Sequence, residues 1–221
     1  MKILAVLSDV DGTIIPLDSV VKCLKDTCKH FKVRILTKKE IMEKTIGYKL
    51  TESIPLLIPE TKGFIKEFTK YYEKLYVKEY KKYAKPFSYV KPTFKILKRK
   101  KIKVGIVTTK KHSEAKAILD GYKIPYDIIV GNDDVKKRKP DPEPVFKACK
   151  LLKVKPKNCI FVGDHPFDMK AAKSAGCIAI GTLTGWGKKL DLKKAGADFI
   201  IKNLKDLDKL IERWSNSKNF L

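Results

Sequence analysis

The stretch of residues 2–13 constrains the fold more than any other part of the chain. Its apolar run, Ile3–Leu7, is long enough for a strand buried on both faces, as strands of parallel sheets are. Asp9 and Asp11 follow one residue apart, and a glycine and a threonine come next, as at a tight turn. Open α/β sheets bind their ligands at the carboxyl ends of their strands. Burying two carboxylates there is costly without a cation or proton between them, so the pair predicts a metal and acid–base chemistry.

Five further apolar runs after residue 86 alternate with segments that carry helical signals. The predicted strands are 102–107, 127–130, 159–162, 177–180 and 198–201, and the predicted helices are 93–100, 112–119, 141–152, 167–175, 190–195 and 204–214. This alternation predicts an α/β fold, a Rossmann-like parallel sheet core with helices on both faces. We expect the tail, residues 215–221, to be frayed.

Residues 14–88 show helical patterns and no evident strand. We predict a helix over 17–31, a helix that Thr37 and Glu40 start as a capping box, a short helix over 51–60 broken by prolines, and a long helix over 61–83. The block has the size of a small helical domain. We therefore predict a core domain of residues 1–15 and 89–221, and an inserted all-α domain of residues 16–88.

Length and composition limit the number of domains and the cellular location. The 221 residues suit one domain with a smaller insertion, and no apolar run approaches the ~20 residues that span a bilayer. The amino terminus lacks a secretory pattern. The five cysteines are odd in number and have no close metal spacing, which indicates reduced thiols and a cytoplasmic protein.

The net charge of +24 arises from 49 Lys and Arg against 25 Asp and Glu. A positive field attracts anions and phosphate backbones. The alternative is a lysine-rich surface that reflects biased composition or a source that lives at high temperature. We favour this alternative, because dispersed lysine is not how planar phosphate recognition is usually built. The charge therefore supports an anionic substrate without identifying it.

Polar residues also follow two later strands. Thr108 ends the second strand, where its hydroxyl could donate to a phosphoryl oxygen or merely start a turn. Lys139 precedes a proline-rich turn, and could be a fixed cation or part of a solvated charge run. Asp164 ends the fourth strand and could complete a magnesium site, because Mg²⁺ prefers oxygen ligands and keeps several waters. Asp168, four residues on, could orient waters or Lys139, or be a first-turn acid of a helix.

These segments, in this order, resemble the four motifs of the haloacid dehalogenase (HAD) superfamily. Residues 9–13 read DVDGT, Thr108 stands at the hydroxyl position, Lys139 opens KPDPEP, and residues 163–168 read GDHPFD. A calcium loop also begins DxDG, but it would continue with acidic ligands, whereas this chain continues Ile14–Leu17. The departures are Ser8 in place of an apolar residue and Thr109 in place of a frequent Asn.

The resemblance implies a role for each matching residue. Asp9 would attack phosphorus, Asp11 would serve as acid and base, Thr108 would hold the phosphoryl group, and Lys139 would offset its charge. Mg²⁺ would be the cofactor, with Asp9, the Asp11 carbonyl, Asp164 and Asp168 as candidate metal residues. The candidate substrate-binding residues are Thr13, Thr108, Thr109, Lys139 and Lys49. An acid at position 11 favours phosphate esters, because phosphonate-cleaving and dehalogenating relatives lack it.

The insertion matches the family's helical (C1-type) cap, which closes over the site. Residues 45–53 resemble the substrate-facing cap segment of phosphoglycolate-phosphatase-like members. Lys49 in this segment could bind a substrate carboxylate or second phosphate, or be an exposed cap lysine.

The sequence therefore predicts a Mg²⁺-dependent phosphohydrolase that cleaves a phosphate monoester of a small metabolite through an aspartyl-phosphate, as a phosphoglycolate phosphatase does. Within the family, a pyrophosphatase and a sugar-phosphate mutase are alternatives. From other classes come a basic nucleic-acid-binding protein or nucleic-acid-end phosphatase, suggested only by charge, and a catalytically dead scaffold, which the intact acidic pair and Lys139 argue against. A capped site favours a small phosphorylated metabolite over a polymer, so a nucleic-acid partner is not expected despite the basic charge. The lack of a long apolar run predicts no membrane partner. We expect a monomer or homodimer.

Overall fold

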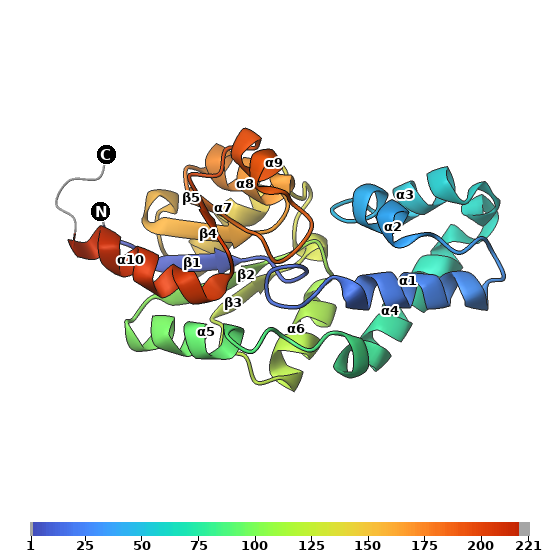
Figure 1. The fold of residues 1–221 in the computed structure, drawn as a ribbon, viewed down its shortest axis with the longest axis horizontal. Coiled ribbons are helices and arrows are strands. Elements are labelled where there is room, and N and C mark those ends of the chain that lie inside the picture. Colours follow the sequence, from blue (N-terminus) through green and yellow to red (C-terminus); the bar gives the residue numbers. More distant parts are fainter. Residues whose placement is uncertain (1, 217–221) are drawn as a thin grey trace. The chain divides into compact units, whose positions relative to one another are not determined.

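The computed structural model describes residues 2–216 (Figure 1). The chain divides into two compact units, one formed by Met1–Pro16 with Pro86–Leu221 and the other by Leu17–Lys85. We call them the core unit and the helical unit and describe each by itself. Most of the predicted frayed tail lies outside the described residues; residues 215 and 216 belong to the last helix.

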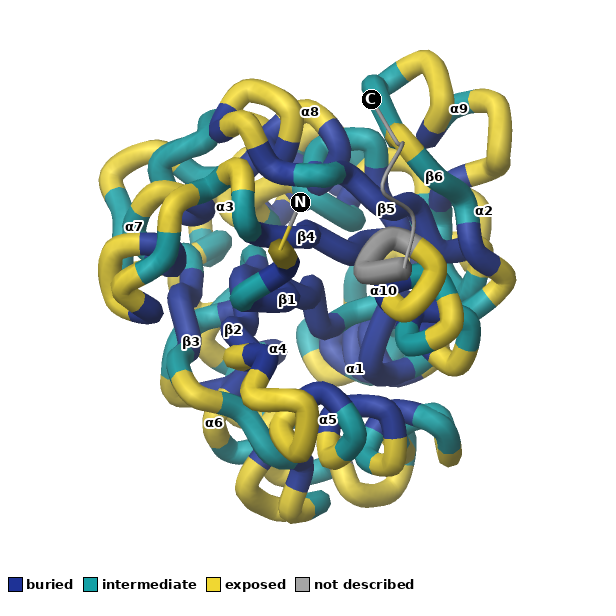
Figure 2. The backbone as a smooth tube through the Cα atoms, turned by 90° about the vertical axis from the view of Figure 1, so that its left-hand side faces the viewer, coloured by how far each residue is buried: buried dark blue, intermediate teal, exposed yellow. Residues whose placement is uncertain are grey.

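The core unit is built on a six-stranded sheet with the order β3-β2-β1-β4-β5-β6, in which every neighbouring pair is parallel. The strands are β1 (Ala5–Ser8), β2 (Lys103–Val107), β3 (Ile128–Val130), β4 (Cys159–Gly163), β5 (Ile178–Thr182) and β6 (Phe199–Ile201). The central strands β1 and β4 are buried throughout, as Figure 2 shows, because helices cover both faces. The predicted Rossmann-like α/β core is confirmed.

The helices of the core unit form two layers (Figure 1). One layer holds α7 (Glu143–Leu152), α8 (Pro166–Ala175) and α9 (Lys189–Lys194), and the other holds α5 (Val90–Arg99), α6 (His112–Gly121) and α10 (Leu207–Asn216). The first layer packs its small and aliphatic side chains against β1, β4 and β5 in one hydrophobic cluster. Gly176 ends α8 at φ 80°, a left-handed conformation that favours glycine.

The helical unit contains α1 (Asp18–His30), α2 (Lys38–Lys44), α3 (Leu50–Leu57), the 3₁₀ helix η1 (Pro59–Phe64) and α4 (Ile65–Tyr83). Helices α1 and α4 pack together, and the Ser19 and Tyr76 hydroxyls share a hydrogen bond of 3.0 Å between them. At the start of α2, the Glu40 N–H donates to the Thr37 hydroxyl and the Thr37 N–H donates to the Glu40 carboxylate. The predicted capping box is therefore present.

Two helix boundaries in this unit differ from prediction. The long helix begins at Ile65 rather than at residue 61, because residues 59–64, with a proline and a glycine, form a 3₁₀ helix first. Helix α3 continues through Pro55 and ends at Leu57, two residues before Pro59. In the core unit, the predicted last helix starts as a 3₁₀ turn, η4 (Leu204–Asp206).

Among the described residues, no helix combines the length and the apolar character needed to cross a bilayer.

Candidate active site

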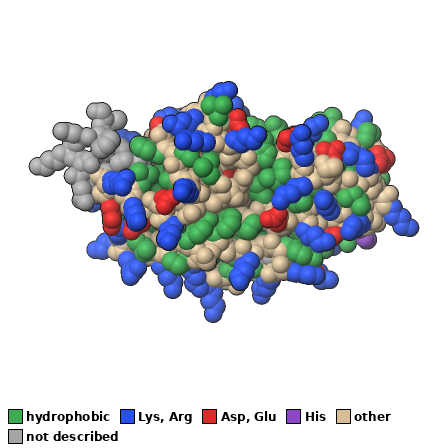
Figure 3. Space-filling model, in the orientation of Figure 1, with side chains coloured by type: hydrophobic (Ala, Val, Ile, Leu, Met, Phe, Trp, Pro, Cys, Tyr) green, Lys and Arg blue, Asp and Glu red, His purple; other side chains and the backbone are tan. Residues whose placement is uncertain are grey.

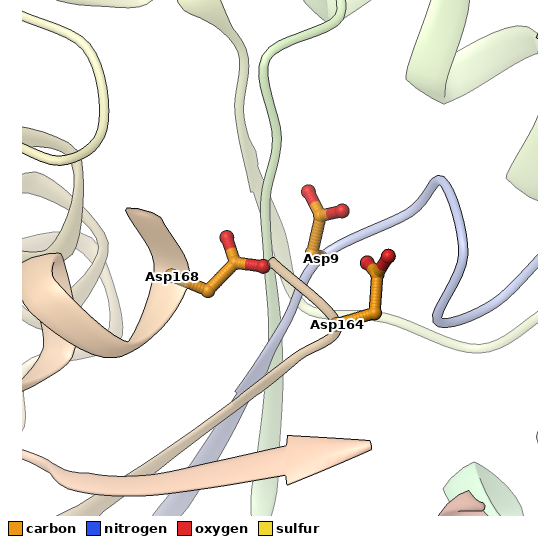
Figure 4. Close-up of side chains that lie close together, drawn as sticks. All are labelled: Asp9, Asp164 and Asp168. Carbon is orange, nitrogen blue, oxygen red and sulfur yellow. The ribbon is translucent and has the colours of Figure 1, made fainter. Parts of the chain in front are cut away.

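Three aspartates converge at the carboxyl ends of the two central strands. Asp9 follows β1, Asp164 follows the neighbouring β4, and Asp168 lies in the first turn of α8. One carboxylate oxygen from each lies within 4.8 Å of the others, and all three residues are buried. Figure 4 shows the three carboxyl groups turned to the same side, with Asp9 between the other two. The strand order reverses between β1 and β4, and open α/β sheets bind ligands at such a reversal.

A buried lysine closes this cluster from one side. The Lys139 ammonium donates to Asp9 Oδ1 at 2.8 Å, to Asp168 Oδ1 at 2.6 Å and to the Val107 carbonyl at 3.1 Å. The Lys139 side chain is only 3% exposed. Burial by itself lowers the pKa of Lys139, but the Asp168 and Asp9 carboxylates outweigh it and raise the pKa above its ordinary value. Lys139 is therefore a fixed cation and not part of a solvated charge run.

The electrostatics of the cluster favour a further cation. Burial is the largest cause that raises the pKa of Asp9, and for Asp164 burial and then the Asp168 and Asp9 carboxylates raise the pKa well above its ordinary value. Three carboxylates beside one ammonium leave a formal excess of two negative charges. A divalent ion that prefers oxygen ligands would neutralise this excess, so the donor set fits Mg²⁺.

The backbone around Asp164 is built for close approach. Gly12 has φ +77°, and a Cβ there would lie 2.3 Å from Asp164 Oδ2; at Gly185 it would lie 1.9 Å away. The Trp186 N–H donates to Asp164 Oδ2 at 2.8 Å, and the Thr13 hydroxyl donates to Oδ1 at 3.2 Å. Any side chain at either glycine would displace the Asp164 carboxylate.

Asp168 has two structural tasks. Besides binding Lys139, it accepts a hydrogen bond of 3.0 Å from the His165 N–H, which caps α8. The contact with Lys139 and the place in the first turn of α8 are compatible with two of the roles considered from sequence, orienting Lys139 and serving as a first-turn acid. His165 accepts from the Phe167 N–H through Nδ1, and its ring packs against Phe167 and Trp186. Burial, and then Lys139, lower the pKa of His165 to about 4, so its ring is neutral near pH 7.

The second acid of the DVDGT stretch lies outside the cluster of described carboxylates. Asp11 Oδ2 instead pairs with the Lys110 ammonium at 3.0 Å. Lys110 follows the predicted phosphate-binding hydroxyls, and its side chain is 6% exposed. Lys110 was not predicted as a site residue, although its place just after a strand end could have indicated it.

Thr108 and Thr109 lie in the loop after β2. The Thr108 N–H donates to the Val130 carbonyl at 3.0 Å, and its buried hydroxyl accepts from the Lys110 N–H at 3.2 Å. A hydroxyl that accepts in this way can still donate its own proton to a ligand. The Thr109 carbonyl accepts from Asn132 Nδ2 at 2.6 Å, which anchors the loop.

Lys49 belongs to the helical unit. Its ammonium lies 3.2 Å from Glu52 Oε1, three residues on, and its side chain is 57% exposed.

The loop after β5, which carries Gly185 and Trp186, was also not predicted from the sequence. Trp186 donates to Asp164, which lies 22 residues earlier in the chain.

Known proteins resemble this chain over most of its length. The model of the haloacid dehalogenase-like hydrolases matches residues 6–182, a range that includes all three clustered aspartates and Lys139. A protein of Caldanaerobacter subterraneus with the provisional name pyrophosphatase PpaX is 32% identical over 224 residues, covering 96% of this chain and 96% of that protein. The phosphoglycolate phosphatase of Aquifex aeolicus is 30% identical over 213 residues, covering 94% of this chain and 96% of its own.

A solved structure agrees with these relatives. The crystal structure of a provisionally named haloacid dehalogenase-like hydrolase of Bacteroides fragilis superposes with a TM-score of 0.84 at 28% identity, covering 93% of this chain and 100% of the other. The family assignment is supported by the fold, by the order of the motifs and by the acidic site. The chain is an enzyme of the haloacid dehalogenase-like hydrolase family.

Proposed function

We propose that this protein is a Mg²⁺-dependent phosphohydrolase that cleaves a phosphate monoester of a small metabolite through an aspartyl-phosphate. One observation carries the proposal: Asp9, buried at the end of the central strand, accepts a hydrogen bond from Lys139 and lies beside the carboxylate of Asp164. A nucleophile with a fixed cation and a second cation site next to it is what in-line phosphoryl transfer requires.

The chemistry divides between the two acids of the DVDGT stretch. An oxygen of Asp9 bonds to phosphorus while the bond between phosphorus and the leaving oxygen breaks, and Asp11 donates a proton to that oxygen. Asp11 then takes a proton from water, whose oxygen bonds to phosphorus and releases Asp9. Lys139 offsets the charge of the phosphoryl oxygens throughout, and the Thr108 hydroxyl holds one of them.

Bound Mg²⁺ would supply electrostatic stabilisation of the phosphoryl oxygens. We propose Asp9, Asp164 and the Asp11 carbonyl as its protein ligands. Asp168 lies against Lys139, with 2.6 Å between the ammonium and Oδ1, and its other oxygen accepts from the His165 N–H. We propose that Asp168 acts by holding Lys139 rather than by direct ligation.

The helical unit is proposed as the C1-type cap, with Lys49 toward the substrate. Its insertion after β1 and its helical content support this assignment. Pyrophosphate and phosphoglycolate, which give two relatives their names, both carry a second anionic group besides the phosphoryl group that is transferred. A cap lysine would suit that second group. Thr13 and Thr109 remain candidates for substrate contact.

We also propose a cytoplasmic location and a small anionic substrate. The five free cysteines support a cytoplasmic location. Figure 3 shows Lys and Arg spread over the face in view, with no single basic stripe, which supports a small anionic substrate over a nucleic acid. A mutase would differ by requiring a bisphosphate activator.

The test is hydrolysis of p-nitrophenyl phosphate with Mg²⁺ and after thorough chelation, followed by pyrophosphate, phosphoglycolate and sugar phosphates at equal concentration. We expect Mg²⁺-dependent release of phosphate, and highest kcat/KM on a substrate with a second anionic group. Undiminished activity after chelation would sink the metal assignment. Phosphate release from none of the substrates would sink the proposed function.

A further inference from the structure

Each acid of the DVDGT stretch has its own buried lysine. Lys139 serves Asp9, as in the phosphoryl-transfer scheme above, while Lys110 lies 3.0 Å from Asp11 Oδ2 and takes no part in that scheme. The Lys110 side chain is 6% exposed and that of Asp11 14%. An ammonium so enclosed is held in place, unlike a surface lysine, and its ion pair restricts rotation of the Asp11 carboxyl group.

The backbone of Lys110 is fixed on both sides. Its N–H donates to the Thr108 hydroxyl at 3.2 Å, and its carbonyl accepts from the Asn132 N–H at 2.8 Å. Asn132 also donates through its side chain to the Thr109 carbonyl. The loop that presents the candidate phosphate-binding hydroxyl therefore presents Lys110 from the same rigid frame.

The turn that carries Asp11 is equally fixed. The Gly12 N–H donates to the Ile15 carbonyl at 2.7 Å, and the Gly12 carbonyl accepts from the Thr184 hydroxyl at 2.6 Å. The Asp11 side chain thus projects from an anchored turn toward an anchored cation. The remaining freedom of its carboxyl group lies in the side-chain rotations, which the contact with Lys110 limits.

We propose that Lys110 is a positioning residue that orients the Asp11 carboxyl group for proton transfer to the leaving oxygen. The inference rests on the proposed function, since it assigns a task only if Asp11 is the acid. Stability alone is a weak explanation for the pair, because buried ion pairs often contribute little net stability. A displacement of about 1 Å at a reacting group can lower the rate about a hundredfold. Positioning of Asp11 would therefore explain why a charged side chain is buried here.

The test compares p-nitrophenyl phosphate with phenyl phosphate, which have the same charge and similar size. Nitrophenolate leaves readily without a proton, whereas phenolate depends more on the acid. A general acid contributes about 10²–10⁴ in rate. We therefore expect Lys110→Met to lower kcat/KM on phenyl phosphate about tenfold more than on p-nitrophenyl phosphate, and Lys110→Arg to recover most of this difference.

Two controls separate positioning from folding. Lys116→Met removes an exposed lysine that pairs with Asp120 on α6, and should leave both substrates within about twofold of wild type. Asp11→Asn should show the same preference as Lys110→Met, and adding Lys110→Met to it should cost little more, because residues that act as a unit are not additive. Thermal unfolding of each variant identifies misfolding; if Lys110→Met misfolds, Lys110→Gln takes its place.

The outcomes are distinguishable. An inactive wild type overturns the proposed function and this inference with it. An active wild type in which Lys110→Met loses equally on both substrates overturns the inference alone. Full additivity of Lys110→Met with Asp11→Asn does the same, since Lys110 would then act independently of Asp11.

Discussion

Lys139 and Asp9 lie 130 residues apart in the chain, yet the Lys139 ammonium is 2.8 Å from Asp9 Oδ1 in the interior of the core unit. The same ammonium binds Asp168 at 2.6 Å. The Lys139 ammonium thus links the proposed nucleophile to helix α8. The negative charge of the three carboxylates that Lys139 does not neutralise indicates where a metal ion would bind.

Removing Lys139 should cost both activity and stability. Lys139→Met leaves buried carboxylates without their cation, and breaking a buried pair from one side typically costs about 3–5 kcal/mol. We expect kcat/KM to fall at least about a hundredfold, and the free energy of unfolding, measured by urea denaturation, to fall by about 3 kcal/mol. Lys137→Met is the matched control, because the Lys137 side chain is 76% exposed. Equal effects of the two substitutions would contradict the assignment.

Magnesium should stabilise the folded protein in the absence of substrate. A ligand that binds only the folded state at about 100 times its Kd adds about 2.7 kcal/mol. Saturating Mg²⁺ should therefore raise the Tm of wild type, and chelation should reverse the rise. Calorimetric scans with and without the ion measure this directly.

Asp164→Asn should abolish the stabilisation by Mg²⁺ without lowering the stability of the metal-free protein. Burial and two neighbouring carboxylates already raise the pKa of Asp164, so a neutral amide should leave the metal-free protein no less stable than wild type. The variant should lose the rise in Tm with Mg²⁺. A rise equal to that of wild type would exclude Asp164 as a ligand.

The glycine at 185 should tolerate no side chain. A Cβ at Gly185 would lie 1.9 Å from Asp164 Oδ2, whereas a Cβ at Gly63 would meet nothing within 4 Å. Gly185→Ala should therefore weaken Mg²⁺ binding and lower kcat/KM at least about tenfold, by displacing the carboxylate. Gly63→Ala should leave both unchanged. Wild-type Mg²⁺ affinity in Gly185→Ala would show that Asp164 does not depend on this close approach.

Much of the fold could be predicted because its signals are local. Each strand is an apolar run, and the capping box at Thr37 and Glu40 needs only four residues. Lys139 was predicted for a different reason: the segment that it opens, residues 139–144, resembles a family motif and stands at the expected place in the order of strands.

The features that escaped prediction depend on contacts distant in the chain. In the sequence Lys110 stands beside Lys111, a pattern typical of a charged surface. The pairing of β1 with β2 brings Lys110 next to Asp11, and this contact is not visible in the sequence. The loop at Gly185 and Trp186 acquires meaning only when β5 pairs with β4 beside Asp164. The later start of α4 reflects a balance between 3₁₀ and α geometry that periodicity does not resolve.

Asp9 is proposed to form the covalent bond to phosphorus. The most direct measurement is the rate of p-nitrophenyl phosphate hydrolysis by Asp9→Asn in saturating Mg²⁺, with Asp9→Ala assayed beside it to guard against deamidation. Loss of a covalent nucleophile should lower kcat at least about a thousandfold while the variants remain folded. Folded variants that keep wild-type kcat would contradict the account.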